Sequence, residues 1–230
     1  NCMSINANKS NVVHFRPPSI PRSDVIFNCN GHTIKFSSNY TYLGLVLNEH
    51  LDYNVTAKAV ASSANRALGL VIAKCKLLGG VCFDVFVKLY ESLVCPIIEY
   101  GAGIWGVKTY SCINSIHYRA CRFFLGVGKY APNAAVTGDL GITPIFDKQW
   151  KSIIRLWCRL NNMSSNRLNA KIHKWADSMS IKHKCVKNWN FLVKKTFCEL
   201  NLSNLSCPEN MDTNYVIKKI CVKITRKTCR

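Results

Sequence analysis

Short stretches rich in β-branched and aromatic residues, a composition typical of strands, occur four times in the first 48 residues: 11–16, 25–27, 33–36 and 40–47. Pro17-Pro18 ends the first stretch, because proline cannot continue a strand ladder. Asn30-Gly31 lies between the second and third, and suits a tight turn with positive φ at both central residues. Gly44 in the middle of the fourth stretch predicts a bulge or a close approach by another backbone. We expect a small β layer whose apolar face lacks a covering partner: Val12, Phe15, Ile26 and Tyr42.

From about Val55 the apolar residues recur every three or four positions, which predicts helices. The predicted helical stripes cover residues 55–74, 83–97, 113–124 and 150–157. Gly79-Gly80 stops the first helix, and Pro96 is expected to kink the second near its end. The first three helices are expected to pack as a bundle around these residues: Leu70, Phe86, Tyr90, Leu93, Ile116, Ala120 and Phe124.

Beyond Asn161 the pattern loosens into weakly amphipathic basic segments at 166–176, 184–200 and 213–227. All five tryptophans are predicted to lie in the core rather than to stack on bases: Trp105, Trp150, Trp157, Trp175 and Trp189. The sequence therefore predicts an α+β fold that is mostly α, with a short strand layer, a helical bundle and a basic helical tail. The expected segments are 1–48, 49–128, 129–164 and 165–230.

The charge of the chain narrows the choice of partner. The net charge is +19, with 13 Lys/Arg against 7 Asp/Glu in residues 1–145 and 18 against 5 in residues 146–230. Such a surface attracts polyanions, and nucleic acid is the leading partner because each neutralised phosphate releases a counterion. A membrane surface is the weaker alternative. No uncharged apolar run reaches roughly 18 residues, so no membrane-spanning helix is expected.

The chain has 13 cysteines, but their placement does not predict a disulfide scaffold. Cys75, Cys95, Cys121 and Cys158 fall on apolar faces, where free thiols behave as small hydrophobes. The first residues lack the apolar core of a signal peptide, so a reducing, intracellular compartment (cytoplasm or nucleus) is expected. There is no C-x-x-C spacing, so no compact zinc site is predicted.

Several blocks together resemble part of a known enzyme family. The segments I-N-A-N-K-S-N-V-V-H-F-R (Ile5–Arg16) and N-Y-T-Y-L-G-L-V-L-N-E-H-L-D (Asn39–Asp52) resemble the end of the palm domain of reverse transcriptases from non-LTR (LINE-type) retrotransposons. Lys88–Trp105, Arg119–Val127 and Ala131–Ile145 resemble the blocks that follow the palm, in the family's order and at about its spacing. The resemblance covers residues 5 to about 160.

The resemblance implies roles for the four segments. Residues 1–48 look like the end of the palm, 49–128 like the thumb, and 129–164 like a connector with a fourth helix, before the basic region 165–230. Tyr42, Leu43 and Gly44 match the turn that grips the primer, a positioning role.

Basic side chains on the thumb-like helices would hold the template–primer duplex through its backbone: Lys58, Arg66, Lys74, Lys76, Arg119 and Arg122. For any single one of them, a solvated basic face is an equally good interpretation. Lys9 matches a palm-block lysine. It would lie near the incoming triphosphate, or it is a solvated lysine before a strand.

Polymerisation in this family needs two carboxylates that bind two Mg²⁺ ions. Their blocks would precede Asn1, and the carboxylates of this chain do not form such a pair. The expectation is therefore no catalytic residue, metal ligand or cofactor in this chain, with Mg²⁺ needed by the complete polymerase. The expected partners are an RNA template, an RNA–DNA or DNA primer duplex, and the palm and fingers of the same polyprotein.

Other functions stay open beside a fragment of an RNA-directed DNA polymerase. The chain could be a non-enzymatic nucleic-acid-binding module, whose mark would be salt-dependent binding without nucleotide incorporation. It could be a helical structural or interaction protein that is basic by chance. It could also be a relic of a mobile element without function.

Overall fold

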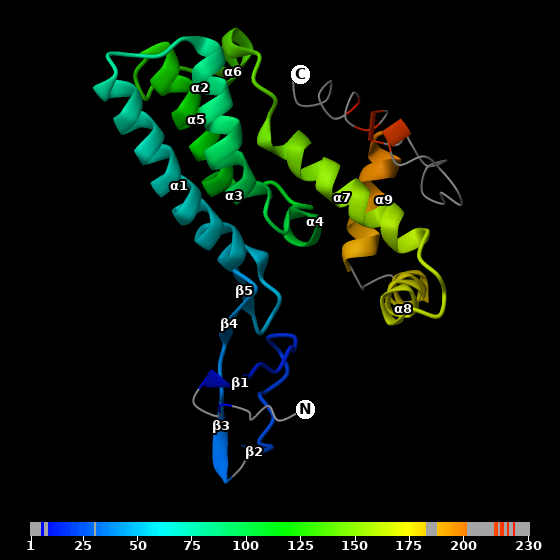
Figure 1. The fold of residues 1–230 in the computed structure, drawn as a ribbon. Coiled ribbons are helices and arrows are strands. Elements are labelled where there is room, and N and C mark those ends of the chain that lie inside the picture. The colour runs from blue at the N-terminus through cyan, green and yellow to red at the C-terminus, as the bar shows by residue number, and fades with distance from the viewer. Residues whose placement is uncertain are drawn as a thin grey trace. The chain divides into compact units, whose positions relative to one another are not determined.

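The computed structural model describes residues 6, 9–29, 31–182 and 188–201, and six positions near the C-terminus: 214, 215, 217, 218, 220 and 223. The fold is α+β and mostly helical, which confirms the predicted class (Figure 1). Two compact units, Asn1–Ser62 and Ser63–Arg230, divide inside the long helix α1 (Tyr53–Leu77). We refer to them as unit 1 and unit 2. This division does not test the four predicted segments, which stay predictions.

Unit 1 contains the described strands: β1 (Asn11–Val12), β2 (Phe27–Cys29), β3 (His32–Phe36), β4 (Asn39–Tyr42) and β5 (Leu45–Asn48). The first three form a sheet of order β1-β3-β2, in which β1 runs parallel and β2 antiparallel to β3. Strands β4 and β5 form a separate antiparallel hairpin. The strand predicted at 11–16 is much shorter than expected, because it pairs with β3 only at Asn11 and Val12. The turn predicted at Asn30-Gly31 lies partly outside the described residues.

The single strand predicted over residues 40–47 is wrong. The chain reverses at Leu43-Gly44, with Tyr42 opposite Leu45 in the register. Leu43 has φ 47° and Gly44 has φ 81°. Positive φ at both central residues is the geometry of a two-residue type I′ hairpin turn, whose twist matches that of the flanking strands. The strand pattern missed this turn because leucine, rather than asparagine, stands at its first central position, whereas the family resemblance had matched Tyr42, Leu43 and Gly44 to a turn.

Polar contacts around Glu49 hold unit 1 together. Glu49 is 7% exposed, and its Oε2 accepts hydrogen bonds from Arg22 (2.8 Å) and Arg16 (3.2 Å). The hydrogen bond from Arg22 holds the pKa of the Glu49 carboxyl below its usual value of 4.5. Thr56 at the start of α1 donates to the Val46 carbonyl at 2.6 Å, which ties the helix to the hairpin.

The apolar face of the β layer is uncovered in this chain. Of the residues expected on that face, Phe15 is 50%, Ile26 71% and Tyr42 59% exposed, and Val12 is half-buried. Among the described residues of the strands, none is buried. The strands therefore contribute little hydrophobic stabilisation to unit 1.

Unit 2 consists of helices, which follow α1 in this order: α2 (Phe83–Leu89), η2 (Tyr90–Val94), α3 (Cys95–Glu99), α4 (Ala102–Trp105), α5 (Ser111–Leu125), α6 (Asn133–Leu140), α7 (Ile145–Asn161), α8 (Leu168–Lys182) and α9 (Trp189–Glu199). Gly126 ends α5 in the left-handed conformation with φ 64°, and its N–H donates to carbonyls of the last turn. The predicted segment 166–176 is part of α8. The predicted segments 184–200 and 213–227 lie partly outside the described residues.

The buried face of α1 is not the predicted one. Leu70, expected in the core, is 70% exposed. The buried positions of this helix in unit 2 are Ala64, Leu68, Val71 and Cys75. The polar residues of this helix are spread around much of its circumference, so periodicity alone did not fix its rotation. The observed face includes small residues, which allow close packing.

A π-helical turn changes the buried face of the second predicted helix. Residues Tyr90–Val94 form η2, and the Cys95 N–H bonds to the Tyr90 carbonyl, five residues back. The residue that this turn inserts shifts the buried stripe from the predicted Leu93/Val94 and Ile97 to Val94, Cys95 and Ile98. Leu93 is therefore 50% exposed, and its predicted place in the core is wrong. The turn lies just before Pro96, where a kink was expected.

An aromatic cluster forms the predicted bundle core. Phe86 and Tyr90 are fully buried, and the Phe86 ring stacks on Phe124 with centroids 4.9 Å apart. Ile116 and Ala120 are buried as predicted, and Phe124 is half-buried. The cysteines expected on apolar faces are also buried: Cys75, Cys95, Cys121 and Cys158. The cysteines Cys75, Cys95 and Cys121 are free thiols.

A second core joins α7 to α9. Trp150 and Trp157 are fully buried, as predicted, and pack with Val193 and Phe197. Trp105 is buried and Trp189 half-buried. Trp175 on α8 is 64% exposed, so its predicted place in the core is wrong.

Two glycines bring α4 close to α7. A Cβ on Gly103 would lie 3.2 Å from the Ser152 carbonyl oxygen. A Cβ on Gly106 would lie 2.7 Å from the Ala102 carbonyl oxygen and 3.3 Å from the Gln149 Cβ. The Gly103 carbonyl also accepts a hydrogen bond from the Trp189 indole at 3.0 Å. The glycines thus allow a backbone approach that any side chain would obstruct.

Candidate nucleic-acid interface

An open pocket of about 400 Å³ lies between the C-terminal part of α1 and the end of α5. Its lining combines apolar and basic side chains: Ile72, Lys76, Arg119, Arg122, Phe123, Val127 and Lys129. Among the described residues, no carboxylate lines it. Four cations without an acidic neighbour in the lining create a positive potential that attracts anions. We call this feature the basic pocket.

Hydrogen bonds hold both arginines of the basic pocket in place. Arg119 Nη1 donates to Asn65 Oδ1 of α1, which joins α5 to α1. Arg122 Nη2 donates to the Ala131 carbonyl at 2.9 Å and to Asn133 Oδ1. Each guanidinium keeps further donors, because it carries five N–H groups. Arg122 therefore has a structural role in fixing the loop before α6, in addition to its charge.

The structure brings together only some of the predicted duplex-holding residues. Lys76, Arg119 and Arg122 meet at the basic pocket. Lys74 is exposed, but two positions along a helix turn it about 200° away from Lys76. Arg66 is exposed and donates to Ser63 Oγ at 3.0 Å. Lys58 is exposed and belongs to unit 1.

Sequence reasoning missed Lys129 as a member of the basic pocket. This lysine lies in the loop after Gly126, and its Nζ is 4.9 Å from the centroid of the Tyr130 ring. It follows the glycine that ends α5, which was visible in the sequence. The fold of the loop back toward α1 was not visible.

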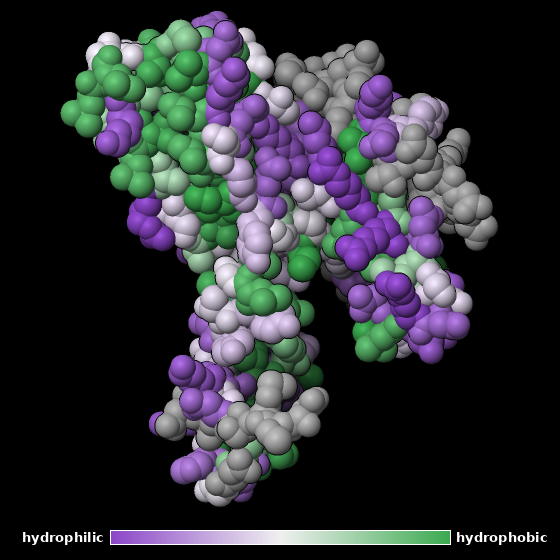
Figure 2. Space-filling model, in the orientation of Figure 1, coloured by the Kyte–Doolittle hydropathy of each residue, from purple (hydrophilic) through white to green (hydrophobic). Residues whose placement is uncertain are grey.

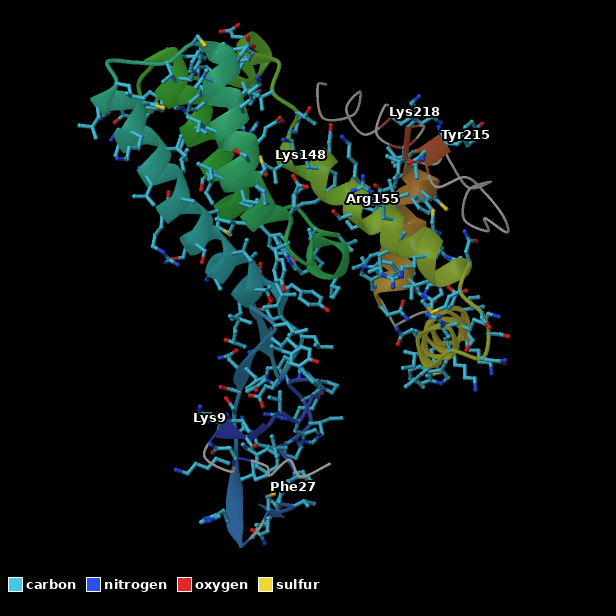
Figure 3. All side chains as sticks on the ribbon, viewed as in Figure 1. Lys9, Phe27, Lys148, Arg155, Tyr215 and Lys218 are labelled. Carbon is cyan, nitrogen blue, oxygen red and sulfur yellow. The ribbon has the colours of Figure 1, made fainter. Side chains whose placement is uncertain are left out.

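A second basic feature follows the exposed side of α7. Lys151, Arg155 and Arg159 lie four residues apart, on the side of the helix away from the buried Trp150 and Trp157. Figure 3 labels Arg155 on this helix. Eight residues of α-helix span about 12 Å. We call these three residues the α7 stripe. Their spacing was apparent in the sequence, but they were not among the predicted site residues.

One neighbouring lysine of α7 is neutralised locally. Lys148 lies on the same side of the helix, but its Nζ donates to Glu91 Oε1 at 2.7 Å and to Cys95 Sγ at 3.5 Å. The other ion pairs of unit 2 among the described residues involve Lys194 and Lys195. The charge of the α7 stripe is therefore available to a partner.

The predicted primer-grip and palm residues lie in unit 1. Tyr42 and Leu43 are 59% and 71% exposed, and Leu43 and Gly44 form the tip of the β4–β5 hairpin. Lys9 is exposed just before β1, and its N–H donates to the Asn6 carbonyl at 3.1 Å (Figure 3). Residues 5, 7 and 8 of the block that includes Lys9 lie outside the described part of the chain. The roles predicted for these residues stay predictions.

A buried titratable cluster lies inside the bundle. His117 is 3% exposed, and its Nδ1 lies 3.1 Å from the Tyr90 hydroxyl oxygen. Burial, with a smaller contribution from the Lys148 charge, lowers the pKa of His117 to about 4. Burial also raises the pKa of Tyr90 above its usual value. Both groups are neutral near pH 7, so the pair suits a structural role rather than proton transfer.

A larger pocket of about 760 Å³ lies beside this cluster. It is lined by residues of α5, α6, α7, α9 and the connections around them, including His117, Tyr118 and Phe146. Within the described part of the chain, no three His, Cys, Asp or Glu side chains gather closely enough to hold a metal ion. None of the described helices has both the length and the apolar character that crossing a bilayer requires. Comparison of the chain with protein-family models, curated proteins and solved structures finds no match.

Proposed function

We propose that this chain is part of an RNA-directed DNA polymerase of a non-LTR retrotransposon and holds the template–primer duplex without supplying the catalytic carboxylates. The observation that carries the proposal is the basic pocket, in which Lys76, Arg119, Arg122 and Lys129 converge from α1, α5 and the following loop. The ordered sequence blocks described above give this pocket its context. These blocks resemble the end of the palm, the thumb and the following connector of such a polymerase.

Basic side chains placed in this way would bind the phosphate backbone of a nucleic acid. Arginine and lysine side chains on rigid helices bind phosphate oxygens, which fixes register without reading base sequence. The pocket is open to solvent, whereas a small-molecule site usually encloses most of its ligand. The hairpin tip at Leu43-Gly44 would position the primer end, and the isolated chain is expected to incorporate no nucleotide in a primer-extension assay with Mg²⁺.

A matched pair of variants tests the basic pocket. Lys76→Gln and Lys74→Gln remove one charge each, from opposite sides of one helix. Binding to a labelled RNA–DNA hybrid is measured by fluorescence anisotropy at several salt concentrations. We expect Lys76→Gln to weaken binding and to reduce the slope of log K against log salt by about 0.9, the value for one lost phosphate contact. Lys74→Gln should leave the slope nearly unchanged.

A combined variant extends the test while sparing Arg122, which fixes the loop before α6. Lys76→Gln, Arg119→Gln and Lys129→Gln together should reduce the slope by roughly 3. Equal losses for Lys74→Gln and Lys76→Gln would show that only net charge matters. An affinity that does not change with salt concentration, or that depends on one base sequence, would contradict the proposal.

A protein-interaction function is the second candidate, because apolar side chains are exposed at the junction of α1 and α2. Leu70, Leu77 and Leu78 are 70%, 78% and 72% exposed, and Figure 2 shows hydrophobic surface over this end of the bundle. A contiguous apolar patch of this kind often marks a protein contact. This function would be favoured if the wild-type protein does not bind nucleic acid. It would also require that the protein associates with itself or with a partner, and that this association depends on Leu77 and Leu78.

A further inference from the structure

Helix α8 is fixed in orientation by contacts on one side. The buried His173 ring packs against Trp157 with centroids 5.3 Å apart, and the His173 carbonyl accepts from Asn190 Nδ2 at 3.0 Å. Asp177 accepts two hydrogen bonds from Lys194 of α9, at 2.6 and 2.8 Å. These contacts determine which side of α8 faces solvent.

The opposite side of α8 carries an exposed apolar row. Leu168, Ile172 and Trp175 lie at i, i+4 and i+7, and are 69%, 52% and 64% exposed. Helical spacing places them roughly opposite Ala170 and His173, which are buried. An exposed apolar row with a tryptophan on a helix that is already packed on its other side indicates a binding surface.

Cations border only one edge of this row. Arg167, Lys171, Lys174 and Lys182 project on one side of it by helical spacing, and all are exposed. The other edge carries the uncharged residues Asn169, Ala176 and Ser180. Lys171 and Trp175 are i,i+4 neighbours, with Cβ atoms about 6 Å apart. The acidic residue of the helix, Asp177, is engaged by Lys194 on the packed side.

We propose that this side of α8 binds single-stranded nucleic acid, with a base stacked on Trp175 and phosphates held by Lys171 and Lys174. Aromatic side chains next to cations form such sites, because every base has a π face and every nucleotide has a phosphate. The inference rests on the proposed function in taking nucleic acid as the partner. It adds a site for an unpaired strand, distinct from the basic pocket.

The one-sided arrangement of charge favours a strand over a membrane. A strand places its phosphates along one side and its bases along the other, which matches a basic edge beside an apolar row. An anionic bilayer attracts cations on both edges of an inserted helix, because both edges face lipid headgroups. Within α8 as the structure describes it, Leu168–Lys182, the exposed lysines lie on one edge only.

The test measures binding of a labelled 12-nucleotide oligo(U) RNA and of an RNA–DNA hybrid of equal length to the full chain. Trp175→Ala should weaken binding of the single strand about 5- to 160-fold, the range for one stacked base. Hybrid binding should stay within about twofold of wild type. Trp175→Phe should retain most of the single-strand affinity. Lys171→Gln with Lys174→Gln should lower the single-strand salt slope by about 1.4.

Two controls remove similar groups elsewhere in unit 2. Leu78→Ala removes an exposed apolar side chain, and Lys88→Gln removes an exposed charge from α2. Neither should change single-strand affinity more than about twofold. Circular dichroism spectra and thermal unfolding should match wild type for every variant, since all the substituted side chains are exposed.

The outcomes separate this inference from the proposed function. If hybrid binding is normal but Trp175→Ala leaves single-strand binding unchanged, the α8 site is wrong and the proposed function stands. If wild-type protein binds neither probe, both fail. If Trp175→Ala abolishes cosedimentation with phosphatidylserine-containing vesicles while RNA binding is unchanged, α8 is a membrane surface, and the inference is overturned.

Discussion

Units 1 and 2 are stabilised in different ways. The buried apolar residues of unit 1 are Ala57, Val60 and Ala61 on α1, whereas its strands are held by backbone pairing and by the ion pairs of Glu49. Unit 2 has two aromatic cores, around Phe86 and around Trp150 and Trp157. Because burial of apolar surface dominates folding stability, unit 2 should retain its structure by itself. The β layer should depend on a cover.

This difference gives the exposed apolar face of unit 1 a physical meaning. Large apolar side chains exposed together cost solubility and expose strand edges to unwanted pairing. A covering partner would remove that cost, and the proposed function supplies one in the palm of the same polyprotein. The comparison can be tested by perturbing each unit in turn.

Native-state hydrogen exchange should show the largest contrast. Amides of α5 and α7 should exchange only through global unfolding, while amides of β3, β4 and β5 open locally. The expected difference in opening free energy is on the order of 5 kcal/mol. Uniformly strong protection across residues 11–47 would show that the β layer is stable without a cover.

Replacing one phenylalanine in each unit with alanine should show the next largest difference, in the free energy of unfolding. Phe86→Ala removes a fully buried ring and should lower the free energy of unfolding by about 3–5 kcal/mol. Phe15→Ala removes a ring that is 50% exposed and should cost less than about 1 kcal/mol. Denaturant unfolding followed by circular dichroism measures both. Similar losses of unfolding free energy would mean that Phe15 and Phe86 are packed equally tightly in their units.

Acid should destabilise unit 2 through His117. Its pKa is about 4 in the folded state, against 6.5 without burial. The unfolded state therefore binds more protons between these values, so the stabilisation is complete above pH 6.5 and is lost as pH falls toward 4. The shift corresponds to about 3 kcal/mol.

The His117→Gln variant should lose correspondingly less stability than wild type between pH 7 and pH 4, as measured by denaturant unfolding. In unit 1, the lowered pKa of Glu49 affects stability at lower pH than His117 does. The stabilisation from Glu49 is present above pH 4.5 and is lost as pH falls below that value. Parallel pH profiles for wild type and His117→Gln would exclude a buried neutral histidine.

The smallest expected effect concerns the hairpin turn of unit 1. Leu43→Asn places Asn-Gly at a two-residue turn with positive φ, where asparagine is favoured and leucine is strained. The substitution should stabilise the hairpin by about 0.5–1 kcal/mol, seen as slower exchange of the β4 and β5 amides. Faster exchange would mean that other contacts of Leu43 outweigh the backbone strain.

The sequence predicted elements that depend on local pattern. The fold class, the helices over 113–124 and 150–157, the buried tryptophans 150 and 157 and the buried cysteines are confirmed. Predictions of buried positions failed where a single helical period was assumed for a segment whose helical geometry changes, or where the pattern did not fix the rotation of the helix. The π turn rotated Leu93 out of the core, and the polar residues spread around α1 left open which side Leu70 would face.

The candidate interface was harder to predict because it joins distant parts of the chain. Lys76 and Arg119 were chosen as basic residues on helix faces, but their proximity depends on how α1 packs on α5. No local pattern encodes that contact. Lys74 looked equivalent to Lys76 in sequence and faces the other way in the structure. Trp175 was predicted to be buried because tryptophan usually is, and nothing in its neighbours revealed that α8 would pack on its opposite side.

The close approach of α4 and α7 also has a consequence for tracing the ancestry of the chain. A Cβ on Gly103 would lie 3.2 Å from the Ser152 carbonyl oxygen of α7. A Cβ on Gly106 would lie 3.3 Å from the Gln149 Cβ of α7 and 2.7 Å from the Ala102 carbonyl oxygen of its own turn, so substitution is restricted at both positions. An exposed charged side chain such as Lys88 is under no such packing constraint, whereas these two glycines are. A diverged relative that keeps this helix pair should therefore retain glycine at 106, with a small residue at 103. That short signature would be a better guide to distant kinship than the basic residues that bind a partner.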